Sequence, residues 1–597
     1  MTFTAPGLDR PGAALQRVAW PERVRFEQAN RSPILIRPKH ALTFALVAGA
    51  SIAHAQWNPS NRQWGKDDPD DYRVVTFNIQ DRICSTNAKQ EGANSWTAIA
   101  VQIAALRPDV LVMVECGDNS ANGTGTAQGY NTVDTVARLA QTLNLLVSGG
   151  TDPYVAGNPA VTSYVTKYTT GYSLPYVYVS DQTDNFNRNV VLSRFPLADL
   201  NGDARTAIGT FTLSADPAHP YYTAGNAGVR GFLFAEINLP DDRYGGDFVM
   251  GGGHLKSGGA AADISERLVA SQRIAYYIDA IYNGLGGATP DPNFRCSNFP
   301  RPNKVLTAQT PVVWAGDFNE DESTNGRDGP VLWTTRAAAV SPGATDGTDR
   351  DRTDSAYDDS RDPFTNNRNT QGSSANNKLD YICWQDSIAT LRRSFVFRAS
   401  TMPSSATPPE FANFPALWFN ISSFTDHRAV VADFVLPVPQ SPAGHALTAP
   451  ADTMQNLEKQ PTLVWTPGTR VTTYSLIVSS NSDLSAPIYT APVAASGPYT
   501  LQVPPGLLSN CGIYYWSVSA TNRGGTAPSP SGVWSFQVGG LCDINLDGFV
   551  DDTDFVLFAT AYDAFETPDG DFNSDGLTDD SDFVIFAGAY DALLACP

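Results

Sequence analysis

Two oxygen-bearing side chains follow a short apolar run in the stretch PVVWAGDFNEDES, residues 311–323. Asp317 and Asn319 are two positions apart, so on an extended chain their carboxylate and carboxamide point the same way. Such a pair can ligate a hard cation or orient a water molecule. The same letters also fit a strand that ends in an Asx turn, so the pair must be judged with the rest of the chain.

Other apolar runs of this chain also carry a polar side chain at one end. A single carboxylate there is usually solvated, and a single histidine is usually structural. The chain has only six histidines, however, and two of them stand at such ends, so we expect six strand ends to meet in one polar site. Besides Asp317 and Asn319, the residues are Asn78 after RVVTF, Glu115 after DVLVMV, His254 after VMGGG, Asp380 before YICW, and Asp426 with His427 before RAVVADF.

The elements that position these residues are mostly short strands. Apolar runs occur at 72–79, 109–115, 188–193, 230–239, 247–254, 311–316, 379–384 and 428–436. Helical periodicity appears at Trp96, Ile99, Ile103 and Leu106, and again at Ile264, Leu268, Ile274, Ile278 and Ile281. Many strands with few helices predict two sheets packed face to face with helices outside. Residues 341–377 have almost no apolar side chains and predict a long surface loop.

Six of these segments, taken in chain order, carry a resemblance to a known family. TFNIQ, PDVLVMVEC, GGHLKSG, WAGDFNED, NKLDYI and TDHRAVVADF resemble the motifs of the endonuclease/exonuclease/phosphatase superfamily, the DNase I-like group. That group also contains neutral sphingomyelinases and inositol-polyphosphate phosphatases. The resemblance covers roughly residues 72–436. It implies a four-layered α/β sandwich and divalent-metal-dependent cleavage of a phosphoester.

The resemblance also implies a role for each matching residue. Metal ligands would be Glu115, Asn78 and Asp426. Catalytic roles would fall to Asp317 at the attacking water, Asn319 at a phosphoryl oxygen, His427 as acid/base, Asp380 as the group that fixes its tautomer, and His254 at the phosphate. Arg230 looks like a further phosphate contact. Whether His427 or Asp317 is the base stays open.

Physical chemistry supports this set of residues without the resemblance. Phosphoryl transfer needs charge neutralisation around phosphorus and an in-line nucleophile more than covalent chemistry. Mg²⁺ or Mn²⁺ suits a site of few carboxylates that leaves room for water and substrate oxygen. An imidazole held by a buried carboxylate has a raised pKa and a fixed orientation, which suits proton transfer.

The sequence leaves three readings of the function. The first is an exported nuclease acting on extracellular DNA or RNA. The second keeps the fold and changes the substrate to sphingomyelin, another phospholipid or a phosphomonoester. The third is an inactive adhesion or scaffold protein. FPALWF, 414–419, is the nearest candidate for a membrane-facing segment, but its place before Asp426 predicts a buried strand. Phosphate contacts, or solvated loop charges, are expected of Lys256, Arg327, Arg350, Arg352, Arg361 and Arg368.

The N-terminus predicts export. Basic residues 37–40 precede the apolar stretch ALTFALVAGASIA and an A-x-A site at 53–55, which is the order of a signal peptide. The apolar stretch is too short for a permanent membrane anchor, so we expect a secreted or cell-surface protein without one. We expect the mature chain to begin near Gln56. The 36 residues upstream of this leader are unusual, and a misassigned start codon is one explanation.

Composition changes twice after the first region. A Pro-rich linker is followed by evenly spaced short strands containing Trp465, Trp516 and Trp534, the pattern of an all-β immunoglobulin- or fibronectin type III-like sandwich. The predicted parts are a leader at 1–55, the phosphoesterase-like domain at 56–437, a linker at 438–446, the sandwich at 447–540 and a small all-α module at 541–597.

The last 57 residues contain an internal repeat. Residues 543–563 and 571–591 match at 14 of 21 positions, and the segment holds fourteen of the acidic residues and no Lys or Arg. Net charge is −21 for the chain, so the tail leaves −7 for the rest, which does not exclude a polyanionic substrate. Seven cysteines suit an oxidising compartment. We expect a disulfide between Cys542 and Cys596, which bracket the acidic tail, and one between Cys84 and Cys116. The odd number of cysteines leaves at least one thiol unpaired.

Each repeat has the spacing of an EF-hand loop, with Gly548 or Gly576 at position 6. Position 12 is Asp instead of Glu, and one helix, 555–563 or 583–591, follows each loop. These departures resemble type I dockerins, which implies two Ca²⁺ and a cohesin-like or cell-surface partner. The expected calcium ligands are Asp543, Asn545, Asp547 and Asp554 in the first loop, and Asp571, Asn573, Asp575 and Asp582 in the second.

Overall fold

The computed structural model describes the chain from Trp57 onward, with gaps. The described residues are 57–83, 89–117, 135–183, 187–208, 230–278, 282, 304, 306–321, 356–372, 377–564, 570–573, 575–592 and 596. The expected leader, the cleavage site, Cys84 with its expected bridge to Cys116, and Arg327, Arg350 and Arg352 lie outside them.

Two six-stranded sheets form the first part of the chain. The first sheet has the order β15-β16-β3-β4-β8-β7 and the second β13-β14-β12-β11-β10-β9, each with one parallel pair, β3/β4 and β11/β12. The strands of the first sheet are β3 Tyr72–Asn78, β4 Val110–Cys116, β7 Tyr176–Thr183, β8 Arg188–Ser193, β15 Thr390–Phe397 and β16 Ala429–Val435. Those of the second are β9 Ala207–Ile208, β10 Leu233–Ile237, β11 Phe248–His254, β12 Val312–Asp317, β13 Ala356–Tyr357 and β14 Asp380–Trp384.

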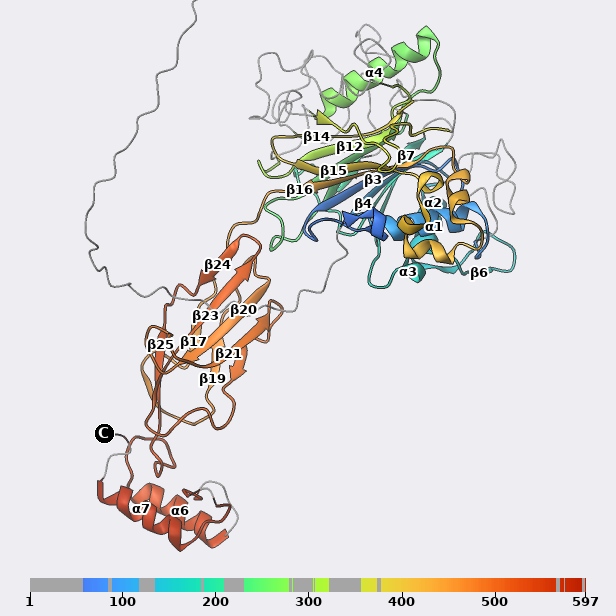
Figure 1. The fold of residues 1–597 in the computed structure, drawn as a ribbon. Coiled ribbons are helices and arrows are strands. Elements are labelled where there is room, and N and C mark those ends of the chain that lie inside the picture. Colours follow the sequence, from blue (N-terminus) through green and yellow to red (C-terminus); the bar gives the residue numbers. More distant parts are fainter. Residues whose placement is uncertain are drawn as a thin grey trace, which may run out of the picture. The chain divides into compact units, whose positions relative to one another are not determined.

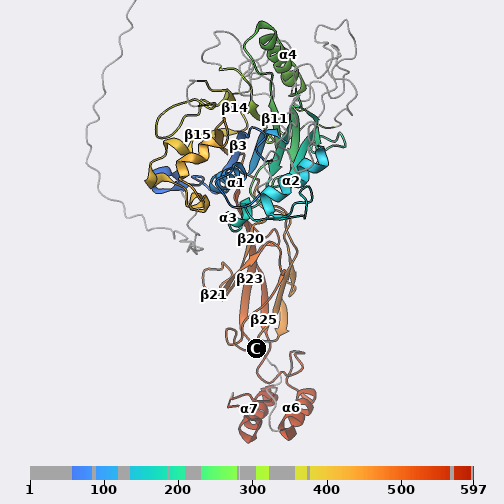
Figure 2. The same cartoon turned by 90° about the vertical axis from the view of Figure 1, so that its right-hand side faces the viewer.

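The sheets stack face to face, and helices cover their outer faces (Figure 1). Alternate residues of each strand enter different cores: Val74 of β3 packs between the sheets, and Val75 packs against helices. The first sheet is covered by α1 Ser95–Leu106, α2 Val136–Ser148 and α3 Val165–Tyr168, and the second by α4 Ala261–Tyr277 (Figure 2). Three apolar cores therefore separate four layers, as expected for this region.

Each of the eight apolar runs contains a strand, and both periodic segments contain a helix. Strands β7 and β15 and helix α2 were not predicted. Short elements fill the connections: β1 Trp57–Asn58, β2 Gln63–Trp64, β5 Gly150–Thr151, β6 Ala160–Val161, and the 3-10 helices η1 Pro59–Asn61, η4 Ala399–Thr401, η5 Ser404–Ala406, η6 Pro409–Asn413 and η7 Trp418–Ser423.

One expectation about the connecting segments is wrong. The segment 414–419 is not a buried strand: it leads into η7, and Leu417 and Phe419 are exposed. Proline at 415 removes a backbone donor that a central strand needs. Of the expected surface loop, residues 356–372 are described, and Asp358, Ser360, Asp362, Asn369 and Thr370 are buried there. The buried Lys378 ammonium pairs with Asp358 at 2.8 Å.

Glycines let strands approach closely beside the predicted site. A Cβ on Gly252 would lie 2.6 Å from Val112 Cγ1 of the facing sheet. Gly316 has φ +149°, and a Cβ there would lie 1.8 Å from the carbonyl oxygen of Gly253 on the paired strand β11. The glycine that precedes Asp317 is therefore required by the parallel β11/β12 pairing.

Residues 447–538 contain two further sheets around a core of Trp465, Trp516 and Phe536. One has the order β17-β19-β22 and the other β18-β25-β23-β20-β21, with β24 paired to β23. The strands are β17 Leu447–Ala449, β18 Met454–Leu457, β19 Thr462–Trp465, β20 Thr473–Ser479, β21 Pro487–Ala494, β22 Thr500–Gln502, β23 Ile513–Asn522, β24 Gly525–Pro528 and β25 Trp534–Val538. Whether this region is of the fibronectin type III kind stays a prediction.

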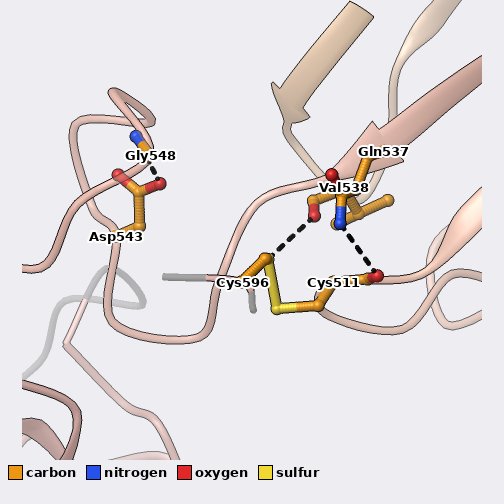
Figure 3. Close-up of a disulfide and its surroundings, with 6 residues drawn as sticks. All are labelled: Cys511, Gln537, Val538, Asp543, Gly548 and Cys596. Atoms are coloured by element: carbon orange, nitrogen blue, oxygen red, sulfur yellow. Dashed lines mark hydrogen bonds between the residues drawn. A yellow bond between two sulfur atoms is a disulfide. The ribbon is translucent and has the colours of Figure 1, made fainter. Parts of the chain in front are cut away.

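The repeats of the tail each contain a loop followed by one helix, α6 Asp552–Ala564 and α7 Asp580–Ala592. The expected Cys542–Cys596 disulfide is wrong. Cys596 pairs with Cys511, with 5.3 Å between the Cα atoms (Figure 3). Cys542 is instead a free thiol, buried with Val550 and Phe558 in the core of the two helices.

Within the described residues, no helix has both the length and the apolar character needed to cross a membrane.

The Gly316 contact yields a stability prediction. Gly316→Ala forces a methyl group against the β11 backbone at a φ that alanine rarely adopts, so we expect a loss of about 3 kcal/mol in the free energy of unfolding. Calorimetric thermal unfolding measures it. Gly259→Ala is the matched control, because a Cβ added there would have no atom within 4 Å. Equal stability of the two variants would contradict the tight-pairing argument.

Candidate active site

Strand register brings three of the predicted residues onto one line across the second sheet. His254 at the end of β11 is the register partner of Asp317 at the end of β12. Asp317 is in turn the partner of Asp380 at the start of β14. All three are buried, with at most 5% of the residue surface exposed. The sheet alone therefore places an imidazole and two carboxylates at one edge.

The first sheet supplies Asn78 and Glu115 from the ends of the parallel strands β3 and β4. The register of β4 with β8 shifts between Met113 and Cys116, and Glu115 has φ +55°. This irregularity turns the Glu115 side chain relative to a regular strand, as bulges beside functional sites commonly do. Glu115 is the half-buried member of an otherwise buried strand.

Asn78 joins the two carboxylates. Its Nδ2 donates to Glu115 Oε1 at 2.9 Å and to Asp317 Oδ2 at 3.1 Å. His254 Nε2 lies 3.7 Å from each of the same two oxygens. One ligand atom each from Glu115, His254 and Asp317 lies within 4.8 Å of the others. Side chains from both sheets thus converge on one small volume.

His427 precedes β16 and lies on the other side of Asp317. Its Nδ1 is 2.7 Å from Asp380 Oδ2, and its Nε2 is 3.6 Å from Asp317 Oδ2. Asp380 is held in turn by Thr370, whose Oγ1 accepts the backbone N–H groups of Leu379 and Asp380. The carboxylate therefore fixes the ring with Nε2 facing Asp317.

Burial and charge act in opposite directions on these groups. Burial raises the pKa of Glu115, while His254 and the Asn78 amide oppose the rise. Burial disfavours the His427 imidazolium, but Asp380 and Asp317 outweigh it and raise the pKa of His427 to about 10. Burial also raises the pKa of Asp380, opposed by His427; for this pair we take the shared proton to sit on the imidazole, because two carboxylates face the ring.

The position of Asn319 agrees with both interpretations of the sequence, an Asx turn and a polar side chain at the site. Its backbone N–H donates to Asp317 Oδ1 at 2.9 Å, which is an Asx turn, and its φ is +56°. That turn leaves Asp317 Oδ2 facing the histidines. Asn319 Nδ2 donates to the carbonyl oxygen of Leu255, which also accepts from Arg230 Nη1 at 2.7 Å. Arg230 is buried beside the site and reaches it through Leu255.

Asp426 is the third expected metal ligand. Among the described residues it shows no contact with the other two, Glu115 and Asn78. Its Oδ1 is buried and has no hydrogen-bond partner, and its charge acts on the neighbouring His427. An unpartnered buried carboxylate oxygen is costly without a cation or proton. One group whose ligand atoms lie close enough to hold one ion is Glu115, His254 and Asp317, so the expected metal-ligand roles of Asp426 and Asn78 stay predictions.

The three described loop cations that were expected at the phosphate are paired with acids. Arg368 Nη1 pairs with Asp321 at 2.6 Å, Arg361 with Asp359 at 2.9 Å, and Lys256 with Asp263 at 3.1 Å. These pairs favour the interpretation that Arg361 and Arg368 are loop charges and not phosphate contacts.

Two positioning residues were missed from sequence. Thr370, described above, sits in the segment read as a surface loop. Asn189 of β8 is buried, and its Nδ2 donates to the carbonyl oxygens of Arg230 and Gly231, which both have positive φ. A buried-strand asparagine in RNVVLS was the available signal, since strands disfavour asparagine.

The tail places the predicted calcium ligands in closed loops. In the first, one ligand atom each from Asp543, Asp547 and Asp554 lies within 4.8 Å of the others. Asp554 Oδ1 accepts the N–H groups of Ile544 and Asn545, and Asp582 Oδ1 accepts those of Phe572 and Asn573 in the second. The last acid of each loop therefore folds back onto its start.

No protein-family model matches the sequence, and no curated protein matches it. Among solved structures, the human Nocturnin catalytic domain with bound sulfate matches at 12% identity, over 62% of this chain and 95% of that one, with a TM-score of 0.30. Sphingomyelinase C from Streptomyces griseocarneus matches at 14% identity, over 61% and 99%, with a TM-score of 0.28. A mannosyl-6-phosphatase from Bacteroides thetaiotaomicron matches at 11%, over 61% and 100%, with a TM-score of 0.30. Such distant likeness carries no functional argument.

The paired carboxylates give a prediction about divalent ions. Glu115→Gln removes one of two neighbouring buried charges, so the metal-free variant should melt at a higher temperature than the parent. It should also lose the increase in melting temperature that Mg²⁺ or Mn²⁺ gives the parent. Fluorimetric melting with and without each ion measures both effects. Glu266→Gln on α4 should behave as the parent. A variant that still responds to the ions would exclude Glu115 as a ligand.

Proposed function

We propose that residues 72–436 form a metal-dependent phosphoester hydrolase. The observation that carries the proposal is the position of Asp317 Oδ2, which lies 3.6–3.7 Å from the Nε2 atoms of both His427 and His254. A carboxylate between two imidazoles can accept a proton while the imidazoles donate to phosphoryl or leaving-group oxygens. The arrangement therefore offers an acceptor and two donors around one point.

Each residue has a task in this proposal. Asp317 and His427 hold the attacking water and its proton between them, and Asp380 keeps His427 Nε2 aimed at that place. Asn319 and His254 hydrogen-bond phosphoryl oxygens, and Arg230 supports Leu255 beneath them. Glu115, Asn78 and Asp426 would hold a Mg²⁺ or Mn²⁺ ion, which would supply positive charge to the phosphoryl group.

We further propose that the substrate is nucleic acid outside the cell. The expected signal peptide supports export, and the net charge of −7 outside the tail leaves a polyanionic substrate acceptable. Lys256, Arg361 and Arg368 are paired with acids among the described residues, so contacts of these three with a nucleic-acid backbone would compete with those pairs.

A second substrate class is favoured by one observation. Leu417 and Phe419 are 61% and 42% exposed, and they lie a few residues before Asp426 and His427. Exposed apolar side chains close in sequence to the site suit a phospholipid surface, which supports sphingomyelin or another phospholipid as the alternative. An inactive adhesion or scaffold protein is the remaining alternative.

A substrate panel tests the hydrolase and its substrate together. The purified chain should cleave plasmid DNA or RNA in Mg²⁺, and EDTA should stop the reaction. Sphingomyelin vesicles and inositol phosphates complete the panel. His427→Ala and Asp317→Asn should each lower the rate by at least about 1000-fold while the protein stays folded. Asp386→Asn, an exposed acid after β14, is the control.

The outcomes separate the alternatives. Cleavage of vesicles alone, weakened by Leu417→Ser with Phe419→Ser, would replace the nuclease by the lipid enzyme. No cleavage of any phosphoester with any divalent ion would leave the scaffold protein.

We propose that residues 541–597 are a dockerin-like module that binds two Ca²⁺, with 447–540 a fibronectin type III-like spacer. The converging acids of each loop support calcium, since oxygen ligands at this spacing surround one ion. Phe555 and Val556 are exposed on α6, as are their repeat equivalents Phe583 and Val584 on α7. These duplicated apolar positions support docking to a cohesin-like or cell-surface partner.

The calcium proposal for the tail has a stoichiometric test. In the full-length chain, Asp543→Ala with Asp571→Ala should remove two bound Ca²⁺ per chain relative to the parent, because each variant deletes the first ligand of one loop. Equilibrium dialysis measures the difference. Asp591→Ala at the end of α7 should leave binding unchanged. A double variant that binds as many ions as the parent would defeat the proposal.

A further inference from the structure

A second kind of acidic loop lies far from the tail in sequence, between β8 and β9. Residues 199–203 read Asp-Leu-Asn-Gly-Asp, and the two tail loops begin Asp-Ile-Asn-Leu-Asp at 543–547 and Asp-Phe-Asn-Ser-Asp at 571–575. All three share acids at positions 1 and 5 and asparagine at position 3. The loop that starts at Asp199 does not match the full EF-hand pattern, because it has no glycine at position 6 and no acid at position 12.

The backbone of the 199–205 loop follows the same path as the first tail loop. Positions 4 and 6 have positive φ in both: +74° and +67° at Gly202 and Ala204, against +59° and +95° at Leu546 and Gly548. Asn201 Oδ1 accepts the N–H of Asp203 at 3.0 Å, as Asn545 Oδ1 accepts that of Asp547 at 2.9 Å. Ala204 adopts the left-handed conformation without the freedom of glycine, so the surrounding contacts must hold it there.

Glu236 of β10 takes the place that Asp554 has in the tail. Its Oε2 accepts the N–H of Leu200 at 2.5 Å, as Asp554 Oδ1 accepts that of Ile544 at 2.7 Å. The Glu236 backbone also brackets the loop, because its N–H donates to Thr206 O and its C=O accepts from Ala198. A neighbouring strand therefore supplies the closing acid that the loop itself lacks.

Buried polar atoms inside this loop have no partner. Asp203 is 2% exposed and Glu236 is 0% exposed, yet Asp203 Oδ2 and Glu236 Oε1 accept no hydrogen bond. The Nδ2 of Asn201, also fully buried, makes no hydrogen bond of regular geometry, although Asn201 and Arg205 both lower the pKa of Asp203 against the effect of burial. Within the described residues, neither Asp203 nor Glu236 forms an ion pair. Buried acceptors without donors normally mark a missing ion or water.

The electrostatics agree with this geometry. Burial raises the pKa of Glu236 to about 8, with Asp203 and Asp199 adding to the rise and backbone N–H groups opposing it. Burial likewise raises the pKa of Asp203. Near neutral pH the cluster must therefore take up either a proton or a cation.

We propose that the loop 199–205 and Glu236 form a third calcium site, within the phosphoesterase-like region. Asp203 Oδ2 and Glu236 Oε1 would be its free ligand atoms, and Asp199 and Asn201 would supply oxygens as the corresponding residues would in the tail loops. The carboxylate oxygens of Asp199, Asp203 and Glu236 do not all lie within 4.8 Å of one another, so the ion would draw them together. The Asn201 amide N–H groups donate to a water in the coordination shell. Ca²⁺ fits better than Mg²⁺ because it accepts many oxygen ligands in irregular geometry. The ion ties the β8–β9 connection to β10.

A full-length background variant isolates this site. Asp543→Ala and Asp571→Ala remove the tail sites, and Glu115→Ala removes the active-site ligand. Calorimetric titration with Ca²⁺ should then show one ion per chain. Adding Glu236→Gln, or separately Asp203→Asn, should weaken that binding at least 100-fold and abolish the Ca²⁺-dependent rise in melting temperature. Asp241→Asn, an exposed acid after β10, should leave both unchanged.

Two results would overturn the proposal. A folded background variant that binds no Ca²⁺ at millimolar concentration would mean that a proton neutralises the cluster. Unweakened binding in folded Glu236→Gln or Asp203→Asn would place the ion elsewhere. The background variant alone shows whether the chain binds this Ca²⁺. The proposal therefore stays testable even if Glu236→Gln or Asp203→Asn prevents folding.

Discussion

The confinement of Asp317 and Glu115 is the constraint on which the site depends. Two carboxylates from different sheets share the amide of one asparagine, with an imidazole 3.7 Å from both. Like charges so close in a buried place are unstable alone, so the surroundings must supply positive charge. His254 and His427 meet that requirement, because each imidazole Nε2 lies within 3.7 Å of Asp317 Oδ2.

This constraint reaches into the sheets that carry the residues. The site exists only while the ends of β3 and β4 face the ends of β11 and β12, and close stacking of the two sheets holds them there. Gly252 and Gly316 allow that closeness, one between the sheets and one within the second sheet. Residues that bear no reactive group therefore decide whether the reactive groups meet.

Sequence reasoning reached the strands and the residue types because both follow local rules. Short apolar runs predicted β3, β4, β11 and β12, and polar residues at their ends predicted the gathering of Asn78, Glu115, His254 and Asp317. The Glu115 bulge, the packed segment around Thr370 and the Cys511–Cys596 pairing depend on contacts between residues far apart in the chain. The spacing of residues in the sequence does not predict such contacts. A disulfide in particular depends on which cysteines lie close together in the folded protein.

The Cys511–Cys596 bond has a topological consequence. The polypeptide enters the tail after β25 and is covalently fastened back to the preceding region at its far end, so the tail is a closed covalent ring of chain. One proteolytic cut anywhere inside that ring opens it without releasing a fragment. Reduction of the bond opens the ring and leaves the tail joined to the rest of the chain by a single covalent path.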